Sequence, residues 1–178
     1  MASPIGHAMV GLASAAVVAR VTGAPRSPEL WLGAFVASGL PDLDLVLGWI
    51  GLRGPRFHRN ASHSLVVIGV VLLVGWGAVK LLALSPDWGI ALAWSAALVS
   101  HPVLDVLTTG PTLGAKDYGI GLLWPLHSKR WFVRRPFIDQ TTNWGACRTV
   151  GDVWAGVRPE IVQLVPLAAL VIALTLVL

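Results

Sequence analysis

Five stretches of the chain are mainly apolar and are long enough, or nearly so, to cross a bilayer as helices. A membrane-spanning helix needs about 20 mainly apolar residues, each adding about 1.5 Å. The pattern predicts such helices over residues 5–21, 30–50, 65–84, 88–108 and 161–178, and it is weakest in the first. Turn-forming residues separate them, and the Ser-Pro-Asp step at 85–87 predicts a tight hairpin.

Composition supports a membrane protein. Hydrophobic residues make up 55% of the 178 positions and charged residues only 12%, against about 25% in soluble domains. The mean hydropathy is +0.72. Since no polar linker divides the chain, we expect one integral membrane domain over 1–178. Its predicted fold class is all-α, a polytopic membrane helix bundle of about five transmembrane helices with an interfacial segment at 109–160.

The basic residues predict how the chain is threaded. The net charge is +4, but its 13 Lys and Arg residues surround apolar segments, which indicates lipid headgroups and topology, with no nucleic acid expected. If the helices alternate in direction, ten lie on one side: Arg53, Arg56, Arg59, Lys116, Lys129, Arg130, Arg134, Arg135, Arg148 and Arg158. Arg20, Arg26 and Lys80 lie on the other. The positive-inside rule then places the first side in the cytoplasm.

Histidines and aspartates occur near one end of four of the apolar stretches. Ionisable groups at membrane depth are costly unless they are paired or bound to metal, so they are rare and usually functional. These residues are His7, Asp42, Asp44, His58, His63, His101 and Asp105. The threading puts all of them on the predicted cytoplasmic side, so the sequence predicts a single cluster.

His101 and Asp105 are four residues apart, so both side chains leave one face of a helix. An imidazole with a carboxylate is a donor set for divalent zinc or iron. The alternative is a purely structural hydrogen-bonded pair.

Pro41 predicts a break in the second helix near residues 38–41, beside Asp42 and Asp44. One of these carboxylates then reaches the cluster and the other supports it, unless both only cap a new helix start. His58 is expected on a loop and His63 in the first turn of the third helix, with Ser62 as its N-cap.

Two other parts of the chain leave alternatives open. His7 alone is compatible with a histidine that reaches for the membrane interface. In the 109–160 segment, Trp side chains among basic residues are typical of an interfacial belt, and the alternative is a cap on the cluster in which Lys129 or Arg130 binds a phosphate. The chain has one cysteine, Cys147, and a single cysteine excludes a Cys-based zinc site. Cys147 is read as a packing residue.

The ordered set of motifs resembles a known family. His7, the Pro-Asp-Leu-Asp step at 41–44, the 58–64 run, His101 to Asp105 with Thr-Thr-Gly at 108–110, and Leu-Leu-Trp-Pro at 122–125 ahead of Lys129 and Arg130 carry the resemblance. The set is similar to bacterial inner-membrane proteins regarded as metal-dependent hydrolases, a family distantly similar to zinc-dependent phospholipase C and P1-type nucleases. The resemblance implies a helical scaffold whose His and Asp side chains hold divalent metal, here zinc as one or two ions.

The resulting prediction is a membrane-embedded hydrolase of an ester or phosphoester, a lipid included, that acts at the cytoplasmic leaflet. Metal-activated water is the expected nucleophile, with Asp42 or Asp44 as base and with Arg59, Lys129 and Arg130 binding the anion. Membrane lipids are the expected partners. The alternatives are a metal-ion or proton transporter, and a non-catalytic membrane adaptor with a structural metal site.

Overall fold

The computed structural model describes residues 2–44, 57–110, 119–138 and 148–177. These residues form α1 (Pro4–Thr22), α2 (Pro28–Gly39), the 3-10 helix η1 (Leu40–Leu43), the π-helical turn η3 (Phe57–Ala61), α4 (Leu65–Leu81), α5 (Trp88–Thr108) and α6 (Val150–Val177). The described residues form no β-strand, and they contain one isolated β-bridge between Ile120 and Trp131. The predicted all-helical membrane bundle is confirmed.

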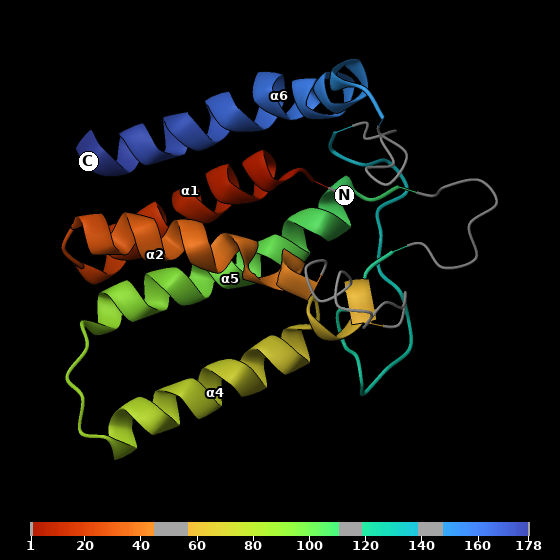
Figure 1. The fold of residues 1–178 in the computed structure, drawn as a ribbon. Helices are drawn as coiled ribbons and strands as arrows, with labels where there is room; N and C mark the ends of the chain where they lie inside the picture. Colours follow the sequence, from red (N-terminus) through yellow and green to blue (C-terminus); the bar gives the residue numbers. More distant parts are fainter. Residues whose placement is uncertain (1, 45–56, 111–118, 139–147, 178) are drawn as a thin grey trace.

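The long helices run side by side with alternating directions (Figure 1). α1, α4 and α6 begin at the end of the bundle where α2 and α5 finish, which we call the N-terminal end. Residues 119–138 lie at this same end (Figure 1). The alternation agrees with the threading expected from the apolar pattern.

Among the described residues, three helices are long and apolar enough to cross a membrane: α1, α5 and α6. α4 is a shorter apolar helix of 17 residues, and α2 has 12. The first, third and fourth predicted segments therefore match α1, α4 and α5 within a few residues. Asp87 accepts a hydrogen bond from the Ile90 N–H and so begins α5 at the predicted hairpin.

The predicted break in the second apolar segment is confirmed, because α2 ends at Gly39 and Pro41 lies in a tighter 3-10 turn. Residues 45–50 of that segment lie outside the described residues. One predicted boundary is wrong. The last helix begins at Val150, eleven residues before the predicted start, so the interfacial segment does not reach residue 160. Asp152 explains this early start, because its carboxylate accepts hydrogen bonds from the Arg148 and Thr149 N–H groups.

Small side chains bring α1, α2 and α5 close together. Their shared core holds Ala15, Ala19, Leu30, Ala34, Ala37, Ile90, Ala93 and Ala97. Gly11 and Gly33 are required where the helices touch, because an added Cβ would lie 2.4 Å from Ser38 Cβ and 2.1 Å from the Trp94 ring. Close packing through small residues is typical of helices in membranes, where apolar burial gives little driving force.

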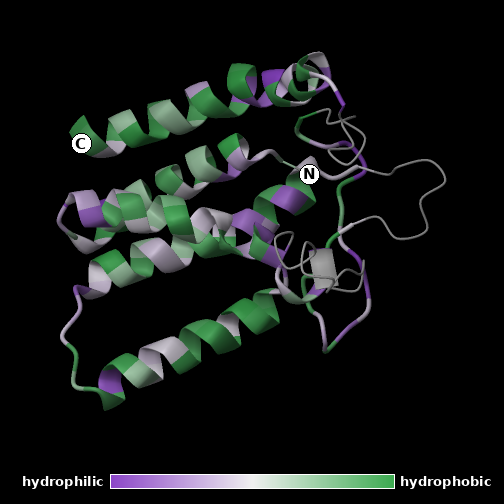
Figure 2. Ribbon diagram, viewed as in Figure 1, coloured by the Kyte–Doolittle hydropathy of each residue, from purple (hydrophilic) through white to green (hydrophobic). Residues whose placement is uncertain are grey.

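The outward faces of the bundle are apolar. Hydrophobic residues follow the helices along their length, and polar residues gather toward the helix ends (Figure 2). α4 and α6 expose large side chains such as Leu73, Val74 and Leu170. Such surfaces suit contact with lipid, and they support the membrane assignment.

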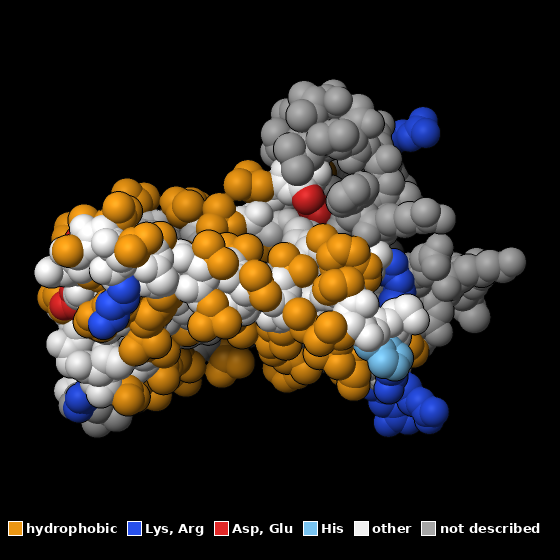
Figure 3. Space-filling model, turned by 90° about the horizontal axis from the view of Figure 1, so that it is seen from below, with side chains coloured by type: hydrophobic (Ala, Val, Ile, Leu, Met, Phe, Trp, Pro, Cys, Tyr) orange, Lys and Arg blue, Asp and Glu red, His pale blue; other side chains and the backbone are white. Residues whose placement is uncertain are grey.

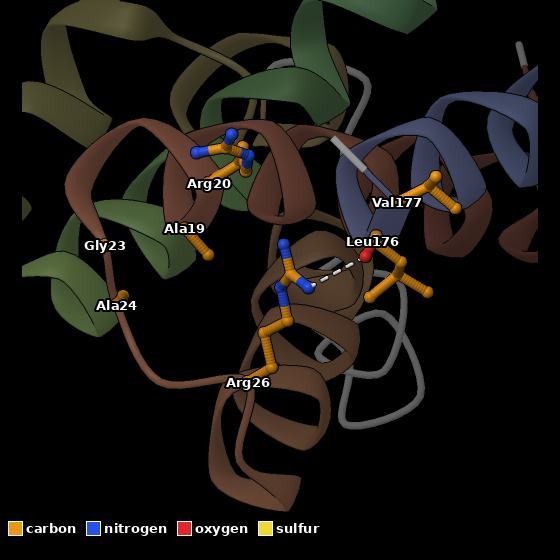
Figure 4. Close-up of a pocket in the computed structure, with 7 residues that line it drawn as sticks. All are labelled: Ala19, Arg20, Gly23, Ala24, Arg26, Leu176 and Val177. Carbon is orange, nitrogen blue, oxygen red and sulfur yellow. Dashed lines mark hydrogen bonds between the residues drawn. The ribbon is translucent and has the colours of Figure 1, made fainter.

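A cavity of about 460 Å³ lies at the opposite end, between the turn after α1 and the last turn of α6 (Figure 4). The Arg26 guanidinium donates to the Thr175 and Leu176 carbonyl groups, two of the final acceptors of α6. Cations at a helix C-terminus satisfy unpaired carbonyl groups and favour the helix dipole. This cavity is separate from the histidine cluster, and Arg26 joins the end of α6 to the start of α2.

Candidate metal centre

Five ionisable side chains from four parts of the chain meet at the N-terminal end of the bundle. His7 comes from α1, Asp42 from η1, His63 from the residues before α4, and His101 and Asp105 from the last turns of α5. Asp42 is 23% exposed at its side chain, and the others are at most 1% exposed. The five groups therefore share a buried position with one side near solvent.

Two imidazoles and two carboxylates bring their ligand atoms close together. His63 Nε2 lies 3.2 Å from His101 Nε2 and 3.6 Å from Asp42 Oδ1, and His101 Nε2 lies 3.5 Å from the same oxygen. Asp105 Oδ2 lies 3.1 Å from His63 Nε2 and 3.9 Å from His101 Nε2. Ligands about 2.0–2.2 Å from a tetrahedral ion are separated by about 3.3–3.6 Å. Asp42, His63 and His101 are thus spaced like one face of a coordination tetrahedron, and Asp105 lies beside its two imidazoles.

The break after α2 orients His101. The Leu40 N–H bonds to the Ala37 carbonyl, as in a 3-10 turn, and the Ser38 carbonyl lies 2.6 Å from His101 Nδ1. Because a carbonyl oxygen can only accept, Nδ1 carries the proton and donates. In the neutral ring, Nε2 then turns its lone pair toward the centre.

Ser62 and Asp44 orient the His63 ring in the same way as the Ser38 carbonyl orients His101. The Ser62 hydroxyl donates to Asp44 Oδ2 at 2.6 Å, which leaves Ser62 Oγ to accept from His63 Nδ1 at 2.9 Å. His63 Nε2 therefore faces the cluster with its lone pair. Supporting hydrogen bonds of this kind are usual behind metal-binding histidines.

The centre favours a cation. Asp42 Oδ1 and Asp105 Oδ2 have no hydrogen-bond partner among the described residues although both are buried. Burial lowers the pKa of His63, but the nearby carboxylates of Asp105 and Asp42 outweigh it and raise that pKa to about 9. The arrangement therefore attracts positive charge, which either a proton or a divalent metal can supply.

His7 lies beside these four groups. Its ring stacks on His101 with centroids 3.5 Å apart, and its Nε2 is 3.3 Å from Asp105 Oδ1, the second oxygen of that carboxylate. His7, His101 and Asp105 form a second possible metal group. His7 thus extends the donor set by one side chain.

The other predicted site residues are placed differently. Asp44 accepts a hydrogen bond from Ser62. His58 lies in η3 rather than on a loop, and its side chain lies outside the described residues. The predicted N-cap of α4, Ser62, is wrong, because Ser64 accepts from the Val66 and Val67 N–H groups. His127 is exposed and stands apart from the cluster.

Among the predicted anion-binding residues, Arg59 interacts electrostatically with the carboxylates of the centre. Its pKa is lowered overall, because burial and the positive charge of Arg130 lower it more than the negative charges of Asp105 and Asp42 raise it. Arg130 donates to the Gly119 carbonyl at 3.2 Å. Lys129 is exposed, and its ammonium lies 4.3 Å from the centroid of the Trp131 ring.

Glu160 is a polar residue that the sequence analysis missed. It is fully buried in α6, and it accepts hydrogen bonds from Ser3 N at 2.7 Å, Gly6 N at 3.1 Å and the Ser3 hydroxyl. Ala2 N donates to Asp105 Oδ1 at 3.2 Å. Two carboxylates therefore hold the start of α1, one turn before His7. The signal available was a lone acidic residue at the edge of an apolar segment.

Comparison with known proteins agrees with this architecture. Inner membrane protein YbcI of Escherichia coli (strain K12) is 32% identical to the chain over 113 residues, which are 59% of this chain and 58% of that protein. The chain thus spans a little over half the length of this relative. No solved structure matches the chain. The family model described as YdjM inner membrane protein matches residues 1–178, and the chain therefore belongs to the YdjM family of integral inner-membrane proteins.

Proposed function

We propose that the protein is a metal-dependent hydrolase that cleaves an ester or phosphoester at the membrane surface. The observation that carries the proposal is the spacing around His63 and His101: their Nε2 atoms lie 3.2 Å apart, and each lies 3.1–3.9 Å from an oxygen of Asp42 and of Asp105. Both imidazoles turn Nε2 inward, because Nδ1 is engaged behind each ring. A donor set of two imidazoles and carboxylates suits zinc.

The burial of the four groups suggests their roles. His63, His101 and Asp105 are fully buried and hold the ion. Asp42 stands on the side nearest solvent, where it completes the coordination or accepts a proton from the attacking water. A bound zinc ion supplies Lewis acidity, which favours both deprotonation of water and attack on a phosphoryl group. Asp44 acts through Ser62, which contacts His63.

Arg59 is the residue best placed to bind a substrate anion. Arg59 is half-buried, and its guanidinium interacts electrostatically with Asp42, Asp105 and Arg130. Its backbone carbonyl accepts a hydrogen bond of 2.7 Å from Gly121 N. The carboxylates hold the guanidinium near the centre by charge attraction, and its planar fork of donors matches the geometry of a phosphate. The expected substrate is therefore a phosphoester rather than a neutral ester.

A second ion has one specific point in its favour. His7 Nε2 faces Asp105 Oδ1 while Asp105 Oδ2 faces His63, so His7, His101 and Asp105 would hold a second ion. We therefore expect one ion in the purified protein, and a second only at raised metal concentration.

Metal content is the first test. The full chain is purified in detergent without chelator, and zinc per chain is measured by elemental analysis for wild type, His101→Ala and Asp105→Ala. About one ion in wild type and a loss in both variants are expected. His127→Ala, which removes an exposed histidine, is the matched control and keeps its metal. Equal metal content in all four proteins would overturn the ligand assignment.

Turnover is the second test, and it separates the enzyme from the metal site. Metal-loaded wild type is incubated with bis(p-nitrophenyl) phosphate and with phospholipid vesicles, and released product is followed. Hydrolysis that is lost on chelation and restored by zinc supports the proposal. If metal-loaded protein cleaves neither phosphoester, the hydrolase proposal is wrong while the metal site is retained. Transport or a structural ion would then be the function.

A further inference from the structure

The loop at residues 119–131 is fixed beside the metal centre. Its two ends are joined by reciprocal hydrogen bonds of 2.8 Å between Ile120 and Trp131. Its tip is fastened to the start of α4, because the Ser64 hydroxyl donates to the Trp124 carbonyl and Leu65 N donates to the Leu122 carbonyl at 2.9 Å. Ser64 follows His63 directly, so the loop and the centre share one support.

The tip of this loop is apolar and exposed. Leu123 is 39% exposed, Trp124 37% and Leu126 78%. Loop 119–131 lies at the N-terminal end of the bundle, beside the helix ends (Figure 1). Tryptophan and aliphatic side chains at the end of membrane-spanning helices prefer the headgroup region of the bilayer.

The segment that carries this tip is also purely cationic. Residues 119–138 contain Lys129, Arg130, Arg134 and Arg135 and no aspartate or glutamate. Lys129, Arg134 and Arg135 are exposed. In Figure 3, hydrophobic side chains cover the length of the bundle while Lys and Arg side chains stand at its ends. Apolar anchors combined with basic side chains match the chemistry of an anionic lipid surface.

We propose that residues 122–135 form a docking surface for anionic phospholipid, which holds lipid headgroups at the mouth of the metal centre. A neutral lipid would leave the four cations without counter-charges, and a water-soluble partner would leave the apolar tip without a cover. Both features are satisfied together by a phospholipid with a net negative headgroup. That such a lipid is also the phosphoester substrate rests on the function proposed above.

The position of the tip can be measured without turnover. Leu126→Cys in a Cys147→Ser background is labelled with an environment-sensitive fluorophore and reconstituted into vesicles of phosphatidylcholine with phosphatidylglycerol. We expect the label to be quenched by a lipid that carries a nitroxide near its headgroup and protected from aqueous iodide. A label at Arg148→Cys, exposed at the same end but outside the loop, is the control and shows the reverse order.

The preference for negative charge is measured by the same label. In vesicles of phosphatidylcholine alone the nitroxide quenching should fall, and the difference between the two compositions should be lost in Arg134→Gln/Arg135→Gln. A label that iodide quenches freely in both vesicles would overturn the docking surface. Protection that is equal in both compositions would overturn its anionic selectivity.

A His101→Ala version of the labelled protein separates the two proposals. The quenching pattern should persist when metal is lost, because the loop is fastened through Ser64 and Leu65 rather than through the ion. If instead the docking surface fails while wild type still binds metal and cleaves soluble bis(p-nitrophenyl) phosphate, the hydrolase stands and its substrate reaches it from water.

Discussion

At the scale of single residues, the candidate centre depends on which nitrogen of each histidine is engaged elsewhere. His101 and His63 both donate through Nδ1, to the Ser38 carbonyl and to Ser62 Oγ, so Nε2 of each ring is left for a ligand. Asp42 and Asp44 are only two positions apart, yet one faces the centre and the other stands behind Ser62. Neighbouring identical carboxylates therefore have different roles.

The first prediction separates a metal ligand from a proton acceptor. Asp105→Asn should lose zinc and activity together, because Asp105 is fully buried and contacts both His63 and His101. Asp42→Asn should keep most of its zinc but lose turnover by about 10²–10⁴-fold, the usual effect of removing a general base. Zinc content and phosphodiesterase rate are measured on the same preparations, and loss of metal from Asp42→Asn would show that it is mainly a ligand.

The second prediction concerns the support behind His63. Ser62→Ala removes the link to Asp44, frees the His63 ring to rotate, and should weaken zinc binding by about 10–100-fold. Ser62→Thr retains the hydroxyl and should bind normally. Affinity is measured by competition with a chelating dye. Ser95→Ala, which removes a hydroxyl bonded to the Ala91 carbonyl within α5, is the control, and a similar loss there would contradict the proposal.

At the scale of elements, close contacts fix how α1 sits between its neighbours. Gly6 faces Glu160 of α6 so closely that an added Cβ would lie 2.5 Å from Glu160 Oε2. A buried carboxylate that has lost its donors is far more costly than one that is fully bonded. The contact between α1 and α6 is thus sensitive to a single methyl group.

The third prediction follows from this contact. Gly6→Ala should lower the free energy of unfolding by about 1–3 kcal/mol through overpacking. It should also weaken zinc binding, since His7 and the Ala2 contact to Asp105 lie on the displaced turn. Gly69→Ala is the matched control, because a Cβ there meets nothing within 4 Å and should be neutral or slightly stabilising in a helix. Thermal melts in detergent compare the two variants, and equal melting temperatures would contradict the prediction.

Helix positions were predictable from the sequence where apolar runs end in strong signals. Asp87 and the Ser-Pro start of α1 mark boundaries by local hydrogen bonds, and these boundaries agree within a few residues. The start of α6 was not predictable from hydropathy, because Asp152 and Glu160 lie inside the helix. Pro41 did indicate the break after α2.

The site was predictable only in part. Residue type and threading were enough to bring His7, His63, His101 and Asp105 to one end of the bundle. The choice of Asp42 over Asp44 and the role of Glu160 depend on helix packing, which no local pattern encodes. Sequence spacing also cannot show which ring nitrogen of a histidine faces its neighbours.

At the scale of the whole molecule, polar and apolar regions separate along the bundle axis. The candidate centre and loop 119–131 lie at the end where α1 begins, whereas Arg26 and the cavity of about 460 Å³ lie at the other. An asymmetry of this kind favours chemistry at one membrane surface.

The fourth prediction fixes which surface this is. In the Cys147→Ser background, His127→Cys should resist a membrane-impermeant maleimide applied to intact spheroplasts and react after lysis, because the positive-inside rule predicts that this end faces the cytoplasm. Leu84→Cys, which is 58% exposed in the turn between α4 and α5, should react before lysis. The opposite labelling order would invert the topology and place the centre outside.

The hydrogen bonds at the start of α1 have a practical consequence. The backbone N–H groups of Ala2 and Ser3 are donated to Asp105 and Glu160, and both residues are buried. An affinity tag at this end of the chain adds bulk beside the contact, and we expect that bulk to disturb it. Preparations tagged in this way should contain less zinc than those tagged after α6, so the choice of fusion end decides whether a metal assay reports on the native protein.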